Sequence, residues 1–118
     1  MISLVVDDHG IWMGTNNGLL IYKDYSGEMR ITDFSTEGNG IYNLEIDKEG
    51  SLWFIQARSD KETLIKLKPD GSSLDYTPNL QGDDRIRSLK VLDNGDLYIG
   101  ATSNNNYLFK YDFTTKEI

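Results

Sequence analysis

The sequence has no cysteine and only one histidine among its 118 residues. The absence of cysteine excludes disulfides, thiolate metal sites and thiol nucleophiles. The histidine, His9, lies in the segment Asp7-Asp8-His9-Gly10, and no further ligands stand at spacings typical of a metal site. We therefore expect His9 to be a turn residue, and we expect neither a bound metal nor another cofactor.

Positive charge is also scarce, because 12 Lys and Arg face 19 Asp and Glu, which gives a formal net charge of −7. No window concentrates enough basic residues to neutralise a row of phosphates, so we do not expect a nucleic-acid partner. No apolar run approaches the roughly 18 residues of a membrane span. Asp7 and Asp8 come too early for the apolar region of a signal peptide. We expect no membrane contact by this segment.

The usual enzyme signatures are missing from the sequence. It has no Gly-rich phosphate loop before a helical stretch and no Gly-x-Ser-x-Gly elbow, and one histidine cannot supply a convincing nucleophile and base pair. Asp7, Asp8, Asp47 and Asp93 stand beside turn glycines, where aspartate accepts hydrogen bonds from the local backbone. We expect these carboxylates to make turns, and we expect no catalytic residues and no enzyme activity.

The most informative feature is an internal repeat, in which residues 4–14 match residues 44–55 and 89–100. Each copy has a leucine, a glycine six positions later and a ring two or three positions after the glycine. These residues are Leu4, Leu44 and Leu89, then Gly10, Gly50 and Gly95, and finally Trp12, Trp53 and Tyr98. The rings could be sugar-stacking platforms, but their recurrence within apolar runs favours packing. We expect the leucines and rings in the core and the glycines in turns.

The apolar residues of each copy recur at every second position, in runs bounded by Gly, Asn or Asp, which is typical of strands. No window has helical periodicity, so we expect essentially no helix. The predicted strands cover residues 2–7, 11–14, 18–23 and 29–34, then 41–47, 52–57, 63–68 and 74–77, then 86–92, 97–102 and 107–112.

Four antiparallel strands in each period of 40 to 45 residues are what a β-propeller blade requires. We predict an all-β fold with a single domain over residues 1–118. It is a partial propeller of about three four-stranded antiparallel blades, with repeats at 1–40, 41–85 and 86–118, the third incomplete. A β-sandwich is the alternative, but it does not explain why the leucine, glycine and ring return in register.

Residues 2–19, ISLVVDDHGIWMGTNNGL, resemble the two-component regulator propeller repeat. That pattern has an apolar strand, Asp, a turn with Gly, apolar-Trp-apolar-Gly-Thr and then Gly-Leu. Residues 41–54 and 86–102 carry it more weakly, because Ile55-Gln56 replaces Gly-Thr and Tyr98 replaces Trp. The resemblance implies the periplasmic, or otherwise extracytoplasmic, sensor region of a bacterial hybrid histidine kinase, which responds to an oligosaccharide. The chain departs from the family by lacking the membrane helix, kinase and receiver, so we expect a fragment of a sensor.

Two other functions stay open. A structural or protein-interaction propeller without a small-molecule ligand is the main alternative. A propeller lyase is the third, and the missing histidine pair and metal ligands count against it.

Alternating hairpins place the loops of a blade at two ends. The short-turn end holds the turns around Gly10, Gly27, Gly50, Gly71 and Gly95, and we expect little room for recognition there. The long-loop end holds residues 16–17, 35–39, 56–62, 79–85 and 103–106, which are rich in amides and guanidinium groups that suit sugar hydroxyls. The alternative is that these asparagines simply tolerate turn geometry. The candidate ligand residues are Asn16, Asn17, Arg58, Arg85, Asn104 and Asn105.

The predicted partners follow from the open ends of a partial propeller. The first and third units would each leave a sheet face uncovered, and exposed apolar faces promote association. We expect the remaining blades, or a second copy in a two-fold dimer, to cover them.

Overall fold

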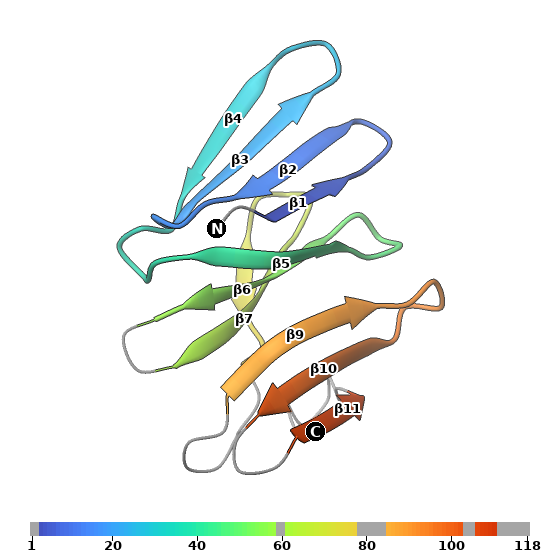
Figure 1. The fold of residues 1–118 in the computed structure, drawn as a ribbon. Helices are drawn as coiled ribbons and strands as arrows, with labels where there is room; N and C mark the ends of the chain where they lie inside the picture. Colours follow the sequence, from blue (N-terminus) through green and yellow to red (C-terminus); the bar gives the residue numbers. More distant parts are fainter. Residues whose placement is uncertain (1–2, 59–60, 78–84, 103–105, 111–118) are drawn as a thin grey trace.

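The structure of the protein, a computed structural model, describes residues 3–58, 61–77, 85–102 and 106–110 (Figure 1). These residues form three separate antiparallel sheets, and none of them is helical. The first sheet contains β1 (Ser3–Val6), β2 (Gly10–Gly14), β3 (Leu19–Asp24) and β4 (Met29–Asp33). The second contains β5 (Ile41–Ile46), β6 (Leu52–Ala57), β7 (Glu62–Leu67) and β8 (Ser73–Asp75). The third contains β9 (Arg85–Val91), β10 (Leu97–Thr102) and β11 (Asn106–Lys110).

Each strand pairs with the next one along the chain, so every sheet is an up-and-down meander. The sheets stack in sequence order, and β5 lies between β1 and β9 (Figure 1). The predicted turn chemistry is present, because Gly27, Gly50, Gly71 and Gly95 have φ between 85° and 102°, a region that favours glycine.

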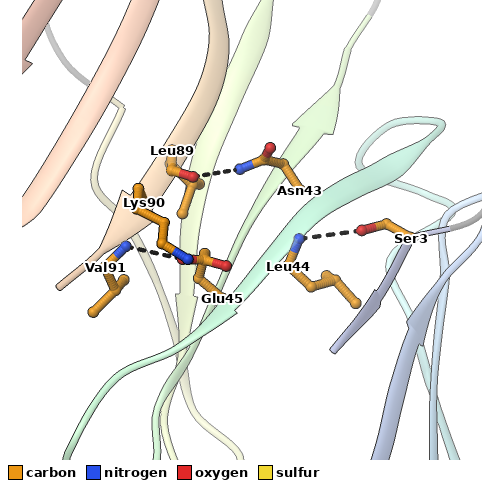
Figure 2. A network of polar contacts seen from close by, with 7 residues as sticks. All are labelled: Ser3, Asn43, Leu44, Glu45, Leu89, Lys90 and Val91. Atoms are coloured by element: carbon orange, nitrogen blue, oxygen red, sulfur yellow. Dashed lines mark hydrogen bonds and ion pairs between the residues drawn. The ribbon is translucent and has the colours of Figure 1, made fainter. Parts of the chain in front are cut away.

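Side chains, rather than a backbone ladder, connect the first strands of the three sheets (Figure 2). The backbone N–H of Leu44 donates to Ser3 Oγ at 3.3 Å, and Asn43 Nδ2 donates to the carbonyl of Leu89 at 2.8 Å. The N–H of Val91 donates to Glu45 Oε1 at 3.0 Å. These hydrogen bonds satisfy backbone groups at the edges of the sheets, where no neighbouring strand forms a ladder.

The second sheet is buried on both faces because it separates two apolar clusters. Leu52 and Phe54 of β6 pack into a cluster shared with Leu20 and Phe34 of the first unit. The alternate residues Trp53 and Ile55 pack into a cluster shared with the third sheet, whose members include Leu89, Leu97 and Ile99. Five consecutive residues of β6, Leu52–Gln56, are 0–2% exposed. This face-to-face stacking is that of propeller blades, and the all-β partial propeller predicted from the sequence is confirmed.

Leu4 corrects the predicted core, since its side chain is 58% exposed whereas Leu44 and Leu89 are 4% and 6% exposed. Leu4 points to the outer face of the first sheet, which no other described sheet covers. Its cross-strand partner Met13 lies on the same face, as do Ile21 and Ile31 farther along the ladder. This leucine of the repeat is buried only where a preceding blade packs on its face of the sheet.

Gly10 corrects the predicted turns. It is the first residue of β2, and its φ is not positive, unlike those of Gly50 and Gly95. A Cβ at Gly10 would lie 2.4 Å from the carbonyl oxygen of Lys23, so close packing of β3 requires glycine here. Of the repeated rings, Trp53 is buried, while Trp12 and Tyr98 are half-buried.

Candidate functional site

The short-turn end is organised by the recurring aspartate and tryptophan. Asp47 Oδ1 accepts hydrogen bonds from the backbone N–H groups of Glu49 and Ser51, both at 2.9 Å, while its Oδ2 accepts from Trp53 Nε1 at 2.9 Å. Asp7 repeats this arrangement with its own turn and with Trp12, whose Nε1 donates at 3.3 Å. The carboxylates thus hold the turns and orient the rings.

Cavities at this end correct the expectation that the short turns leave little room. One cavity of about 230 Å³ lies between the first and second sheets, and one of about 450 Å³ lies between the second and third. The first is lined by Asp7 and Trp12, and the second by Asp47 and Trp53, so the two cavities occupy equivalent positions. We define the first as the Trp12 cavity, whose lining also includes Tyr22, Arg30, Thr32, Lys68 and Pro69.

Of the predicted asparagines, the structure describes Asn16 and Asn17. Asn16 and Asn17 are exposed, and Asn17 Oδ1 accepts a 2.6 Å hydrogen bond from Thr15 Oγ1 within its own loop. This contact fits the turn-forming alternative for Asn17. Asn104 and Asn105 lie outside the described residues.

Arg85 lies at the start of β9 and pairs with Glu62, with 3.3 Å between Nη1 and Oε2. The Glu62 side chain is 13% exposed and that of Arg85 39%. Burial raises the pKa of the nearby Tyr42 phenol, Glu62 raises it further, and Arg87 and Arg85 oppose the shift. Tyr42 therefore remains a protonated hydrogen-bond donor at neutral pH, close to a carboxylate and two guanidinium groups.

Gln56, near the end of β6, and Arg58, directly after β6, lie on the side of the first sheet. Gln56 is 0% exposed, and its Nε2 donates to the carbonyl of Phe34 at 2.9 Å. Its Oε1 and Arg58 Nε are both buried and have no hydrogen-bond partner among the described residues. The loop of residues 35–40 packs tightly against them, since a Cβ at Gly38 would lie 3.1 Å from Arg58 Cγ and 3.2 Å from Gln56 Cδ.

The structure separates the two predicted arginines. Arg58 follows Gln56 by two positions and lies on the side of the first sheet, whereas Glu62 pairs in register with Ala57 and lies on the opposite face. Arg58 and Arg85 therefore belong to different blade junctions at the long-loop end. No group of three His, Cys, Asp or Glu side chains suited to a metal occurs in the described part of the chain.

Gln56 and Tyr42, both at the long-loop end, were not among the candidate ligand residues chosen from the sequence. Gln56 carried a signal, because it replaces the threonine of the repeat. Tyr42 carried none, since an aromatic residue within an apolar run is typical of a core.

No family model matches the sequence, and no curated protein matches it either. The chain is similar to solved lyase structures. It matches a streptogramin B lyase with a TM-score of 0.67 and 19% identity. It matches a virginiamycin B lyase from Staphylococcus aureus with a TM-score of 0.70 and 18% identity. A catalytically inactive variant of that enzyme with quinupristin gives a TM-score of 0.69 and 17% identity. The alignments cover 93% of this chain and 39–40% of the lyase chains. The shared feature is the fold.

The expectation that the chain is not an enzyme is contradicted by this comparison, because the similar structures are enzymes. The missing sequence signatures do not exclude catalysis, since a propeller can supply catalytic groups from separate blades. The propeller interpretation of the repeat is supported, whereas no family model supports its assignment to two-component regulators. In the described part of the chain, no helix is long and apolar enough to cross a membrane.

Proposed function

We propose that this chain recognises a hydroxyl-bearing ligand, such as an oligosaccharide, at its long-loop end, as part of a propeller sensor. The supporting observation is that two buried atoms, the acceptor Gln56 Oε1 and the donor Arg58 Nε, have no hydrogen-bond partner among the described residues. A hydroxyl group can donate to the first atom and accept from the second. Leaving buried polar atoms unpaired costs roughly 1–3 kcal/mol each, so a ligand that pairs them gains affinity.

The sensor role is supported by the resemblance of residues 2–19 to the two-component propeller repeat. Its setting would be periplasmic or otherwise extracytoplasmic. The loop of residues 35–40 covers Gln56 and Arg58, so a ligand has to displace it. A propeller site collects loops from many blades, whereas the structure describes two four-stranded sheets and one three-stranded sheet. We therefore expect the isolated chain to bind weakly, with a Kd in roughly the millimolar range.

Calorimetric titration with oligosaccharides from mannan and pectin tests this proposal. We expect weak, saturable binding that Arg58→Ala abolishes, whereas Arg30→Ala at the short-turn end leaves it unchanged. Binding that survives Arg58→Ala, or the absence of any saturable heat, would contradict the proposal.

A lyase activity is the second candidate, and the similarity to virginiamycin B lyases favours it. Incubating the chain with quinupristin, and following its consumption by mass spectrometry, tests this candidate directly. Consumption above that of a boiled control supports a lyase, and an unchanged quinupristin signal counts against it.

A further inference from the structure

Register places Thr32 of the first sheet at the position of Tyr76 in the second unit. In the first sheet, Trp12 pairs with Tyr22, and Leu20 pairs with Thr32. In the second sheet, Trp53 pairs with Lys66, and the N–H of Tyr76 donates to the carbonyl of Leu64, two residues before Lys66. Leu20 likewise precedes Tyr22 by two residues, so Thr32 and Tyr76 stand at equivalent places along the outer strand.

The two residues leave their tryptophans in different surroundings. The Tyr76 ring lies against Trp53, with 5.2 Å between ring centroids and 47° between planes, and Trp53 is 2% exposed. Thr32 has no ring, Trp12 stays half-buried, and Thr32 lines the Trp12 cavity. The ring neighbour of Trp12 is Tyr22 of its own sheet, whereas Tyr76 lines the larger cavity of about 450 Å³ beside Trp53.

The size of the Trp12 cavity suits a single ring. Its volume is about 230 Å³. An apolar cavity of about 150 Å³ already holds benzene. Tyr22 forms another aromatic wall, because its ring centroid lies 4.5 Å from that of Trp12.

The charges around the cavity favour an anion. Arg30 and Lys68 both line it, and the Arg30 guanidinium lies 5.0 Å from the Tyr22 ring centroid. Among the described residues that line the cavity, Asp7 is the one carboxylate, and both its oxygens accept hydrogen bonds from the turn or from Trp12. A guanidinium forms short, charge-assisted hydrogen bonds with a carboxylate.

We propose that the Trp12 cavity binds a small aromatic carboxylate, whose ring packs against Trp12 and whose carboxylate pairs with Arg30. Lys68 adds positive charge at the same place. This site lies at the opposite end of the blades from Gln56 and Arg58, so it does not depend on the proposed oligosaccharide recognition.

Benzoate is the probe, and saturation-transfer NMR together with tryptophan fluorescence is the readout. We expect saturable binding to the 118-residue chain with quenching of Trp12. Thr32→Tyr adds a bulky ring to the lining of the cavity, so it should weaken binding about tenfold or more, equivalent to ~1.4 kcal/mol. The matched control, Thr36→Tyr, changes an exposed residue at the other end and should leave the affinity unchanged.

A second variant keeps the test decisive if Thr32→Tyr fails to fold. Arg30→Gln should weaken benzoate while leaving the neutral analogue benzyl alcohol unaffected. The proposal is overturned if benzoate shows no saturable binding, if glucose binds as well as benzoate, or if Thr32→Tyr and Thr36→Tyr have equal affinity.

Discussion

At the scale of single residues, the fold depends on an aspartate and a tryptophan that recur in register. Asp47 holds its turn and orients Trp53, which then fills the junction between the second and third sheets. The repeat predicted the buried ring and the turn glycine. It could not predict that Trp12 is half-buried, because the exposure of a ring depends on the residues packed around it rather than on the tryptophan itself.

Replacing Trp53 with alanine should be strongly destabilising, because it opens a large cavity and leaves Asp47 without its indole donor. We expect a loss of about 3–5 kcal/mol in the free energy of unfolding, measured by urea denaturation. Thr36→Ala, at an exposed loop residue, should change it by less than about 0.5 kcal/mol. A similarly small effect of Trp53→Ala would contradict the assignment of this ring to the core.

Asp70 provides a test of the exposed turns. A hydrogen bond from Ser72 Oγ, at 2.6 Å from Oδ1, and one from the Ser72 N–H, at 2.9 Å, lower the pKa of this carboxyl below its ordinary value. Because the folded pKa is the lower one, the stabilisation is complete above the unfolded pKa of about 3.9 and disappears as the pH falls through the folded value.

Carboxyl NMR titration measures this shift. Ser72→Ala should raise the pKa of Asp70 toward its ordinary value, while the pKa of Asp24, which Ser26 and the Glu28 N–H lower, stays unchanged. An unshifted Asp70 in the unmodified protein would show that the turn is not formed as described.

At the scale of elements, alternation of apolar residues predicted all eleven strands to within two residues at each end. Alternation cannot reveal an irregular strand. β5 carries a register shift between Tyr42 and Glu45, and Asn43 there has φ of 59°, which only a few non-glycine residues adopt. The irregularity aims the Asn43 side chain at the carbonyl of Leu89 in the next sheet.

Asn43→Ala should lower the free energy of unfolding by about 1–3 kcal/mol, because it removes this hydrogen bond and places alanine in the left-handed region. Asn43→Gly also loses the bond but tolerates the backbone, so it should be less damaging. Chemical denaturation of both variants makes the comparison. Equal losses would indicate that the backbone at residue 43 is not left-handed.

At the scale of the whole molecule, the outer face of the first sheet is the main exposed apolar surface of the described residues. Leu4, Val6, Met29 and Ile31 are each 57–61% exposed. These four residues lie on one face of the first sheet. The second sheet uses its equivalent face to pack on the first sheet. The sequence predicted this open face from the strand pattern, but it could not show which leucine of the repeat would be exposed.

We propose that two copies of the chain associate through this face, as a two-fold dimer. Ile31→Glu should then shift the mass found by light scattering after gel filtration from a dimer toward the 13.4 kDa monomer. Leu74→Glu, on the outer strand of the second sheet, is the matched control and should not shift it. A monomeric unmodified chain at micromolar concentration would contradict the association.

The central claim is that the second sheet is a blade buried between two others. Methyl NOE spectroscopy tests it most directly, because Leu52 and Ile55 of the same strand belong to different clusters. We expect Leu52 methyls to show NOEs to Leu20 and Ile55 methyls to show NOEs to Ile99, with none between Leu20 and Ile99. A β-sandwich has one shared core, so NOEs from Leu20 to Ile99, or an exposed Ile55, would contradict the propeller.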